Sequence, residues 1–319
     1  MPSPSRCLTA GDAFCFVRDL AGHQPTDAPR VGLELEWLTY SIVDASRRVD
    51  MTDLAPALDA LATGLPCGSR LTIEPGGQVE ISTLPHDSVV DAIDAARTDT
   101  ARLRSTLQDV GLAIVGAGLD RCRPPTRVLD TPRYRAMEEY FDADGPAGRT
   151  MMCNSASMQI NVDFDGNVGD AWRAANVVAP LLGARFSEPG PNRLGVWSRI
   201  DHTRTAAVGG DEPGDAWASY ALAARVMFIR RDECDCVPIL DGMTFRDWIK
   251  RGHPLGWPTE TDLAEHLTTL FPPVRPRGYL EVRTIDALDD ARWPEAAELA
   301  VSMLLDGPQR RAAVELACR

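Results

Sequence analysis

Lysine is almost missing from this sequence: Lys250 is the only one, and every other strongly basic side chain is arginine. No GxxxxGK[ST] motif is present, which excludes a P-loop nucleotide site. Long apolar runs are missing as well, since stretches such as NVVAPLLGA are too short to span a bilayer. The first residues, MPSPSRCLTAGDAF, lack the basic flank and apolar block of a signal peptide, so we expect a cytoplasmic location.

Cysteine and histidine do not form a motif. The eight cysteines have no regular spacing, and the tightest pair, Cys234 and Cys236, has no two further ligands nearby for zinc. We therefore expect free thiols in a reducing compartment. The five histidines lie apart in the sequence, and no Ser-His-Asp or Cys-His pattern indicates a covalent mechanism.

The charge balance limits the partners. With 46 acidic and 33 basic residues the net charge is −13, which argues against broad nucleic-acid binding because that requires a basic surface. Small anionic substrates stay possible if metal ions and a few arginines reverse the field locally. We expect no nucleic acid, no membrane and no obligate protein partner. The 44% hydrophobic content is typical of a soluble globular protein.

Apolar spacing predicts helices between strand-like segments. Helical periodicity covers 53–64, 88–112, 131–142, 167–184, 259–271, 293–305 and 308–317. Thr131 and Pro132 are typical of a helix start, Gly111 of a helix end, and Gly169 or Asp170 of the cap of the fourth helix. Residues 112–120 are predicted as a buried strand, and 187–195 as a loop. Without a steady βαβ rhythm, the order favours an α+β fold with a mainly antiparallel sheet.

Four segments alternate between apolar and polar residues with the period of a β-strand. They are VGLELEWLTY (31–40), LTIEPGGQVEIST (71–83, two strands around a Pro-Gly-Gly turn, with Glu74 ending the first), SMQINVDFD (157–165) and GYLEVRTID (278–286). In each of them one face is apolar. The opposite faces carry Glu34 and Glu36; Gln78, Glu80 and Ser82; Gln159, Asn161 and Asp163; and Tyr279, Glu281 and Arg283.

A solvent-facing sheet surface would explain any one of these strands. It explains the whole set less well, because such surfaces usually mix Thr, Lys, Arg and Ser, whereas Glu and Gln recur here without lysine. A face of this kind favours bound hard cations, Mg²⁺ or Mn²⁺. Arg283 lies two residues from Glu281 and could hold a phosphate or carboxylate beside the metal. The set therefore predicts metal-assisted phosphoryl transfer.

Several motifs resemble those of one known family. GLELEW, EPGGQVEIS, PRYRAMEEYF, MMCNSASMQINVDF, RLGVWSRIDHTRT and HLTTLFPPVRPRGYLEVRTID occur in the order found in the bacterial and plant type of glutamate–cysteine ligase. The similarity spans roughly residues 31 to 305 and is greatest to the actinobacterial branch that serves ergothioneine synthesis. It implies one glutamine-synthetase-like carboxylate–amine ligase domain over 1–319, with a curved sheet whose concave face holds Mg²⁺ and ATP.

The resemblance also implies a reaction. The γ-carboxylate of L-glutamate would be phosphorylated by ATP, and the amine of L-cysteine would then displace phosphate to give γ-glutamylcysteine. The family's metal ligands match Glu34, Glu36, Glu74, Glu80, Gln159 and Glu281. Arg283 matches the arginine that faces the transferred phosphate of ATP, and with Glu36 it is the expected catalytic residue. Arg193 matches the arginine that contacts the glutamate carboxylate, and Trp197 would shape that pocket.

Two alternatives stay open. The same chemistry could serve a different amine acceptor, because no residue singled out above recognises a thiol. The chain could instead be a non-catalytic relative that binds metal or nucleotide, although the complete carboxylate set and Arg283 count against this. One departure from the family concerns the stretch between Phe186 and Arg193, which is shorter than the glycine-rich loop expected there.

Overall fold

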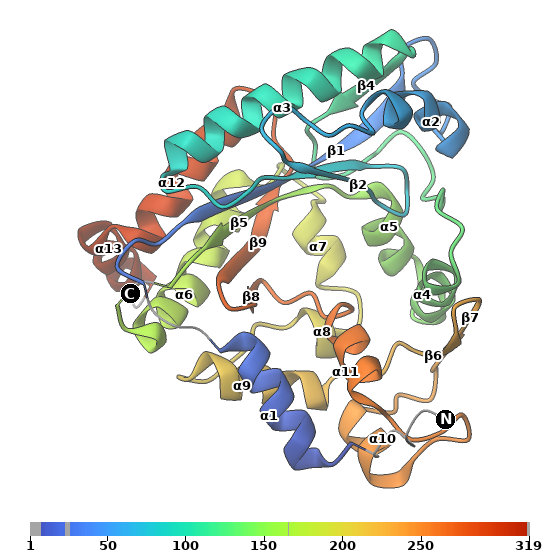
Figure 1. The fold of residues 1–319 in the computed structure, drawn as a ribbon, viewed down its shortest axis with the longest axis vertical. Coiled ribbons are helices and arrows are strands. Elements are labelled where there is room, and N and C mark those ends of the chain that lie inside the picture. Colours follow the sequence, from blue (N-terminus) through green and yellow to red (C-terminus); the bar gives the residue numbers. More distant parts are fainter. Residues whose placement is uncertain (1–7, 23–25, 165, 318–319) are drawn as a thin grey trace.

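A computed structural model describes residues 8–22, 26–164 and 166–317. Within these ranges, nine strands lie in two sheets (Figure 1). They are β1 (Val31–Ser41), β2 (Arg70–Ile73), β3 (Val79–Ser82), β4 (Leu112–Val115), β5 (Ser157–Val162), β6 (Phe228–Asp232), β7 (Asp235–Pro238), β8 (Val274–Pro276) and β9 (Leu280–Asp286).

The larger sheet has the order β2-β3-β1-β5-β9-β8, and β4 pairs with the far end of β1. Every pairing is antiparallel. The separate β6–β7 hairpin is antiparallel too. Because β1 is the longest strand and pairs with three others, it sets the register of the polar face of the sheet. The predicted α+β class with a mainly antiparallel sheet is confirmed.

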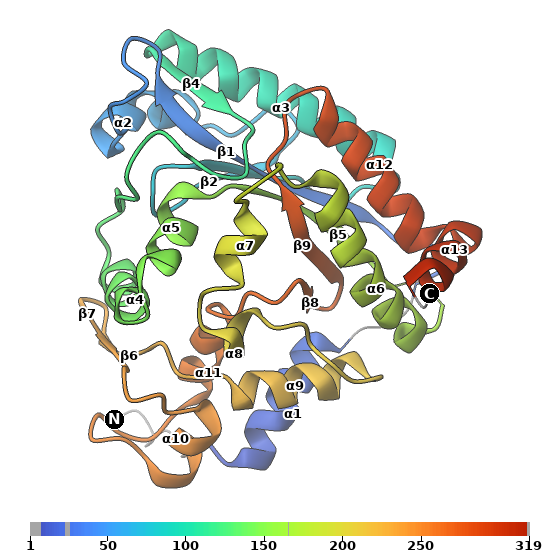
Figure 2. The same ribbon diagram turned by 180° about the vertical axis from the view of Figure 1, so that it is seen from behind.

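The described helices surround this sheet on both faces (Figures 1 and 2). They are α1 (Ala10–Ala21), α2 (Met51–Ala60), α3 (Val89–Asp109), α4 (Pro132–Ala143), α5 (Pro146–Asn154), α6 (Val168–Phe186), α7 (Arg193–Trp197), α8 (His202–Thr205), α9 (Pro213–Ala223), α10 (Phe245–Arg251), α11 (Glu260–Leu267), α12 (Arg292–Leu305) and α13 (Gly307–Ala317). Within the described ranges, no helix is long and apolar enough to cross a membrane.

Helices α3, α6 and α12 pack on the apolar face of the sheet (Figure 2). That face carries Leu33, Leu35 and Trp37 of β1, each at most 3% exposed, in one core cluster with Trp172 of α6. Burial of this face holds the register of β1, because a slip by one residue would turn Glu34 and Glu36 into the core. The alternation predicted for β1 is therefore confirmed, and it directs both carboxylates to the opposite face.

Helices α4, α5 and α7 lie on the side of the opposite, polar face (Figures 1 and 2). Helices α4 and α5 share a second core cluster with the β6–β7 hairpin, built around Met137, Phe141, Met152 and Phe228. Helices α1, α9, α10 and α11 form the other end of the molecule (Figure 1). The polar sheet face thus lies between two apolar clusters.

All seven predicted helices are present, with different ends. Helix α4 begins after its cap Thr131, and α3 is followed by Gly111 at φ +77°, as predicted. The helices predicted at 53–64 and 259–271 are α2 and α11, which span Met51–Ala60 and Glu260–Leu267.

Four local predictions were wrong. The cap of α6 is Asn167, whose side chain accepts from Asp170 N, and not Gly169 or Asp170. Strand β4 ends at Val115, which is 43% exposed, so 112–120 is not one buried strand. Strand β2 ends one residue before Glu74. The predicted loop 187–195 ends early, because α7 begins at Arg193 with Asn192 as its cap.

Candidate active site

The strand register brings most of the predicted site residues to one face. Glu36 of β1 lies opposite Glu80 of β3, and Glu34 lies opposite Gln159 of β5. Glu281 of β9 lies opposite Asn161, the next residue of β5 on this face. Strands far apart in the sequence therefore place their polar side chains side by side, as the alternation predicts.

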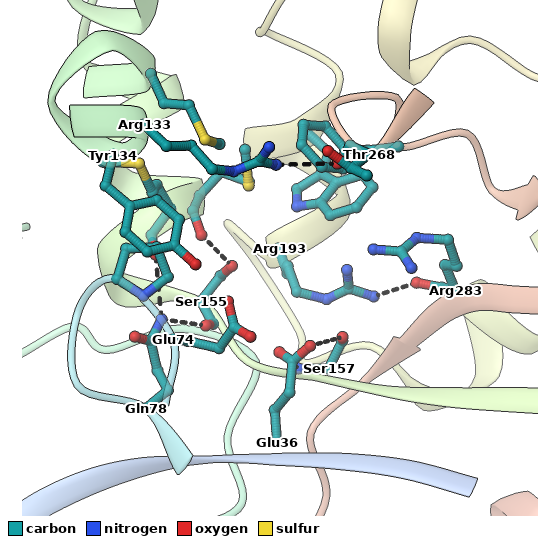
Figure 3. A pocket seen from close by; sticks show the side chains of 16 residues that line it. Glu36, Glu74, Gln78, Arg133, Tyr134, Ser155, Ser157, Arg193, Thr268 and Arg283 are labelled. Carbon is teal, nitrogen blue, oxygen red and sulfur yellow. Dashed lines mark hydrogen bonds between the residues drawn. The ribbon is translucent and has the colours of Figure 1, made fainter. Parts of the chain in front are cut away.

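A cavity of about 170 Å³ opens between this face and helices α4, α5 and α7. Of the predicted residues, Glu36, Glu74, Arg193, Trp197 and Arg283 line it (Figure 3). The remaining predicted residues are not among its lining residues: Glu34, Glu80, Gln159 and Glu281. These four residues contact the lining residues or lie beside them on the sheet. The prediction therefore includes residues that line the cavity and residues that support them.

Glu74 reaches the cavity because of the turn that follows β2. Gly77 has φ +85°, a backbone conformation that favours glycine. A Cβ atom on Gly76 would lie 2.0 Å from the carbonyl oxygen of Cys153, so only glycine allows the turn to pack on the end of α5. The Pro-Gly-Gly sequence therefore fixes the position of Glu74 against the carboxylates of β1 and β3.

Glu36, Glu74 and Glu80 form what we call the carboxylate half of the site. Glu36 accepts hydrogen bonds from the backbone and hydroxyl of Ser157 at 2.8 and 3.0 Å. Glu80 accepts from the Thr72 hydroxyl at 2.8 Å. Burial raises the pKa of Glu36 and of Glu80. The pKa of Glu74 is raised to about 8, by burial and by the negative charges of these two neighbours. The surrounding protein therefore does not compensate three ionised carboxylates, and without a cation Glu74 takes up a proton at neutral pH.

Glu34 has an intermediate environment. Its carboxylate accepts a hydrogen bond from the Asn161 side chain at 2.9 Å. Burial and the charges of Glu281 and Glu80 nevertheless raise the pKa of Glu34 to about 6. The amide of Asn161 thus only partly offsets the cost of burying this carboxylate.

Glu281, Arg275 and Arg283 form the arginine half of the site. Arg275 donates to both oxygens of Glu281, with Nη2 at 2.8 Å from Oε1, and Arg283 Nη1 donates to the same oxygen at 2.7 Å. Arg283 also donates to the side-chain oxygen of Gln159. Although burial opposes it, the charges of Arg275 and Arg283 lower the pKa of Glu281 to about 2. In contrast to the carboxylate half, this carboxylate is already paired.

Arg193 is anchored in the protein by three hydrogen bonds. Its Nε donates to Asp286 at 3.0 Å, and its Nη2 donates to the carbonyl oxygens of Arg283 and Ile285, each at 2.9 Å. The residue is only 1% exposed, and its Nη1 finds no hydrogen-bond partner among the described residues. This nitrogen is therefore the part of Arg193 that is available to a bound anion.

The loop before α7 is tied to the same aspartate. Glu188 donates its backbone N–H to Asp286 at 3.0 Å, and its carboxylate accepts from Gly118 N and from Arg121, each at 3.1 Å. The short stretch between Phe186 and Arg193 thus has defined contacts, in place of the glycine-rich loop that the resemblance leads one to expect.

Trp197 lies beside Arg193 and Arg283, two of the arginines that line the cavity. The guanidinium carbons of Arg193 and Arg283 are 5.3 and 5.8 Å from its ring centroid, and its ring packs edge-on against Phe271. Aromatic faces stabilise cations at this range. Trp197 therefore holds the two guanidinium groups on the same side of the cavity.

The donor set of the carboxylate half suits a hard cation. Within the described ranges, no three His, Cys, Asp or Glu side chains converge in a way that could hold a metal ion. The chemistry nevertheless fits, because the carboxylate half offers oxygen ligands whose mutual repulsion a divalent cation would relieve. Glu36, Glu74 and Glu80 are the residues that such an ion would approach.

Several lining residues escape the sequence prediction. Arg133, Tyr134 and three methionines come from α4 and α5. Their approach to the sheet depends on tertiary packing. The segments PRYRAMEEYF and MMCNSASMQINVDF, which contain these residues, are among the motifs that resemble the family. Their presence in that set is the signal that could have indicated a place in the site. Arg275, which does not line the cavity but pairs with Glu281, comes from β8, a strand too short for its alternation to be recognised.

The chain is similar in sequence to one family of enzymes. The model of the family described as glutamate-cysteine ligase family 2 matches residues 30–317. Glutamate–cysteine ligase EgtA of Mycolicibacterium smegmatis is 41% identical over 298 residues, which cover 88% of this chain and 70% of that protein. EgtA of Mycobacterium tuberculosis is 41% identical over 88% of this chain and 69% of its own length. Chloroplastic glutamate–cysteine ligase B of Oryza sativa subsp. japonica is 27% identical over 88% of this chain and 62% of its own length.

Solved structures show a weaker likeness. Glutamate–cysteine ligase of Francisella tularensis in complex with AMP superposes with a TM-score of 0.48 at 14% identity, over 89% of this chain and 68% of that one. Plasmodium falciparum glutamine synthetase gives a TM-score of 0.41 at 9% identity, over 93% and 55%.

Proposed function

Because the chain belongs to glutamate-cysteine ligase family 2, we propose that it catalyses the ATP-dependent joining of L-glutamate to L-cysteine. ATP phosphorylates the γ-carboxylate of glutamate, and the amine of cysteine displaces phosphate from the acyl phosphate. The products are γ-glutamylcysteine, ADP and phosphate. We place the reaction in the cytoplasm, as the first step of ergothioneine biosynthesis, and treat residues 1–319 as one catalytic domain.

One observation carries the proposal: carboxylates and arginines face each other across the same cavity. Glu36 and Glu74 line one side, and Arg193 and Arg283 line another. Phosphoryl transfer between two anions needs both features, because cations must neutralise the phosphates and the acceptor carboxylate before they can meet. Positioning contributes more than a strong base in such a reaction.

The two arginines have separate roles in the proposal. Arg193 binds a carboxylate of glutamate through Nη1, the one nitrogen of its guanidinium group that makes no hydrogen bond within the described part of the chain. Trp197 shapes this pocket from beside the guanidinium group. Arg283 faces the transferred phosphate of ATP, and its pairing with Glu281 fixes its direction. Because both arginines are held by the protein, little reorganisation is needed when the anions bind.

The carboxylates have the complementary role. Glu36, Glu74 and Glu80 would hold Mg²⁺ or Mn²⁺, with Glu34, Gln159 and Glu281 as further predicted ligands. When bound, such an ion neutralises phosphate charge and polarises the γ-phosphoryl group. Glu36 is the central residue of this group, because Ser157 orients both of its oxygens toward the cavity side of β1.

ADP release in the presence of glutamate, Mg²⁺ and ATP tests this function when amino acids are compared as acceptors. Release that depends on cysteine, with γ-glutamylcysteine identified by mass spectrometry, is the expected result. Release with another amine and not with cysteine would mean that the acceptor is misassigned. If ATP binds and no acceptor supports turnover, the chain is a non-catalytic relative.

A further inference from the structure

The cavity has a second wall that the proposed roles do not use. Arg133 and Tyr134 come from the first turn of α4, and Met137 follows one turn later. Met151 and Met152 come from α5. Figure 3 shows the sulfur atoms gathered around Arg133 and Tyr134, away from Glu36. The cavity is therefore chemically divided: carboxylates and two anchored arginines on one side, thioethers and a third arginine on the other.

The three methionines belong to the second core cluster, yet they also face the cavity. Met137 and Met152 are 5% and 4% exposed, and Met151 is half-buried. Packing alone would explain their burial, but not why the thioethers of two helices converge on the cavity that contains Glu36. Thioethers are soft and polarisable, so they make favourable contacts with a thiol. They provide no strong hydrogen-bond partner, so a hydroxyl placed against them would be desolvated without compensation.

Arg133 is held far more loosely than the other two arginines of the cavity. Its Nη2 lies 3.5 Å from the carbonyl oxygen of Thr268, and its Nη1 lies 3.6 Å from Glu265. Glu265 is already paired with Arg230, whose Nε donates to its two oxygens at 3.0 and 2.9 Å. The guanidinium group of Arg133 therefore keeps N–H groups available for a carboxylate that enters the cavity.

These contacts point to a subsite for the second substrate, an inference that rests on the proposed function. We propose that Arg133 binds the α-carboxylate of the acceptor amino acid, and that the wall formed by Met137, Met151 and Met152 contacts its thiol side chain. Glutamate does not suit this wall, because its second carboxylate would lie against thioethers. The methionine wall thus supplies the recognition of a thiol that the sequence alone does not reveal.

The role of Arg133 is tested by comparing acceptors with and without a carboxylate. Arg133→Ala should lower kcat/KM for cysteine about 30-fold through KM, as expected for the loss of one charge-assisted pair. The KM values for glutamate and ATP, and the turnover of cysteamine, which lacks the carboxylate, should stay unchanged. Arg133→Lys should restore part of the loss. Arg135→Ala, on the same helix but paired with Asp130 outside the cavity, is the matched control.

A merely structural Arg133 would give a different pattern. If it only joins α4 to the segment around Thr268, Arg133→Ala would impair cysteine and cysteamine equally and lower the unfolding temperature. That result would overturn the subsite.

The methionine wall is tested at Met151, which is half-buried and so tolerates change better than its neighbours. Wild type should prefer cysteine over 2-aminobutyrate, and both over serine. Met151→Gln should reduce the ratio of kcat/KM for cysteine over serine about 10-fold, because the amide can pair with a hydroxyl. Met151→Leu keeps an apolar wall, so its preference over serine should be largely retained. An unchanged ratio in Met151→Gln would contradict the proposal.

Failure of the proposed function can be told apart from failure of this subsite. If wild type ligates no acceptor, the proposed function fails, and calorimetric titration of cysteine into wild type and Arg133→Ala decides the subsite alone. Binding to wild type that weakens in Arg133→Ala would support it. Equal binding to both proteins, or no binding to wild type, would overturn it.

Discussion

Glu74 and Glu281 are both predicted metal ligands, yet their electrostatic environments are opposite. Burial and the neighbouring carboxylates raise the pKa of Glu74 to about 8, whereas Arg275 and Arg283 lower the pKa of Glu281 to about 2 against the effect of burial. Glu281 is fully buried, whereas Glu74 lines the cavity and is only partly buried, so burial does not cause the difference. The neighbours do: Glu74 faces two further glutamates, and Glu281 faces two arginines.

The comparison separates two tasks within one sheet. The arginine half is complete without a ligand, and it fixes the direction of Arg283 through Glu281. The carboxylate half does not hold three ionised carboxylates without a cation, so its stability improves when a cation binds. A strand sequence with alternating glutamates does not distinguish the two cases, because the distinguishing residues lie on other strands.

The largest effect is expected for Glu36→Gln in the carboxylate half. The change keeps the size of the side chain but removes the central charge, so turnover should fall at least about 100-fold, on the order of 3 kcal/mol in the barrier. Initial rates of ADP release measure this, with circular dichroism to verify the fold. Near-normal activity would remove Glu36 from the catalytic assignment. Glu295→Gln, on the surface of α12, is the control and should have wild-type rates.

Glu281→Gln should instead act mainly on stability. It leaves Arg275, whose side chain is 11% exposed, without its charged partner, so the free energy of unfolding should drop by about 3 kcal/mol. Urea unfolding monitored by fluorescence gives this value. The exposed Arg185–Glu295 pair provides the comparison, since Glu295→Gln should cost less than about 1 kcal/mol. Equal costs for the two variants would mean that the arginine half is not a structural unit.

Glu74→Gln should have the opposite sign from Glu281→Gln. Removing one of three mutually repelling carboxylates should raise the free energy of unfolding by about 1 kcal/mol in metal-free buffer. The same denaturation experiment with EDTA present measures it. Activity should fall in this variant even though stability rises, which is the usual sign of a functional position. A loss of stability in EDTA would contradict the account of the carboxylate half.

The smallest effect is the response of the folded protein to Mg²⁺. Millimolar Mg²⁺ should raise the thermal unfolding midpoint of wild type by about 1–2 °C, because the ion binds the folded state in preference to the unfolded chain. The shift should persist in Glu281→Gln relative to its own baseline and disappear in Glu36→Gln. Differential scanning calorimetry with Mg²⁺ and with NaCl at equal ionic strength separates specific binding from screening. If the shift vanished in Glu281→Gln alone, the assignment of the two halves would have to be exchanged.

The face of each long strand is predictable from the sequence because its period is local. The apolar residues Leu33, Leu35 and Trp37 determine which way Glu34 and Glu36 point, and no knowledge of other strands is needed. The strand pairings that assemble the site are not local, so alternation alone shows that the faces exist but not that Glu36 lies opposite Glu80.

Other parts of the site could not be predicted from the sequence, for a physical reason. Arg275 belongs to a strand of three residues, which is too short to show a period, yet it does most to lower the pKa of Glu281. The prediction of a loop through residue 195 was wrong because the Asn192 cap starts a helix of only five residues, which has too few residues for a periodic pattern. The methionine wall depends on how α4 and α5 pack, which only the structure reveals.

The contacts of Glu188 separate the position of Arg193 from the length of the loop before it. Asp286 receives both the backbone N–H of Glu188 and the guanidinium group of Arg193, while the cap formed by Asn192 starts α7 on its own. Only residues 189–191 lie between these two fixed points. Insertions or deletions there change what the loop covers but leave Arg193 where β9 holds it. The length of this loop can therefore change while Arg193 keeps its place.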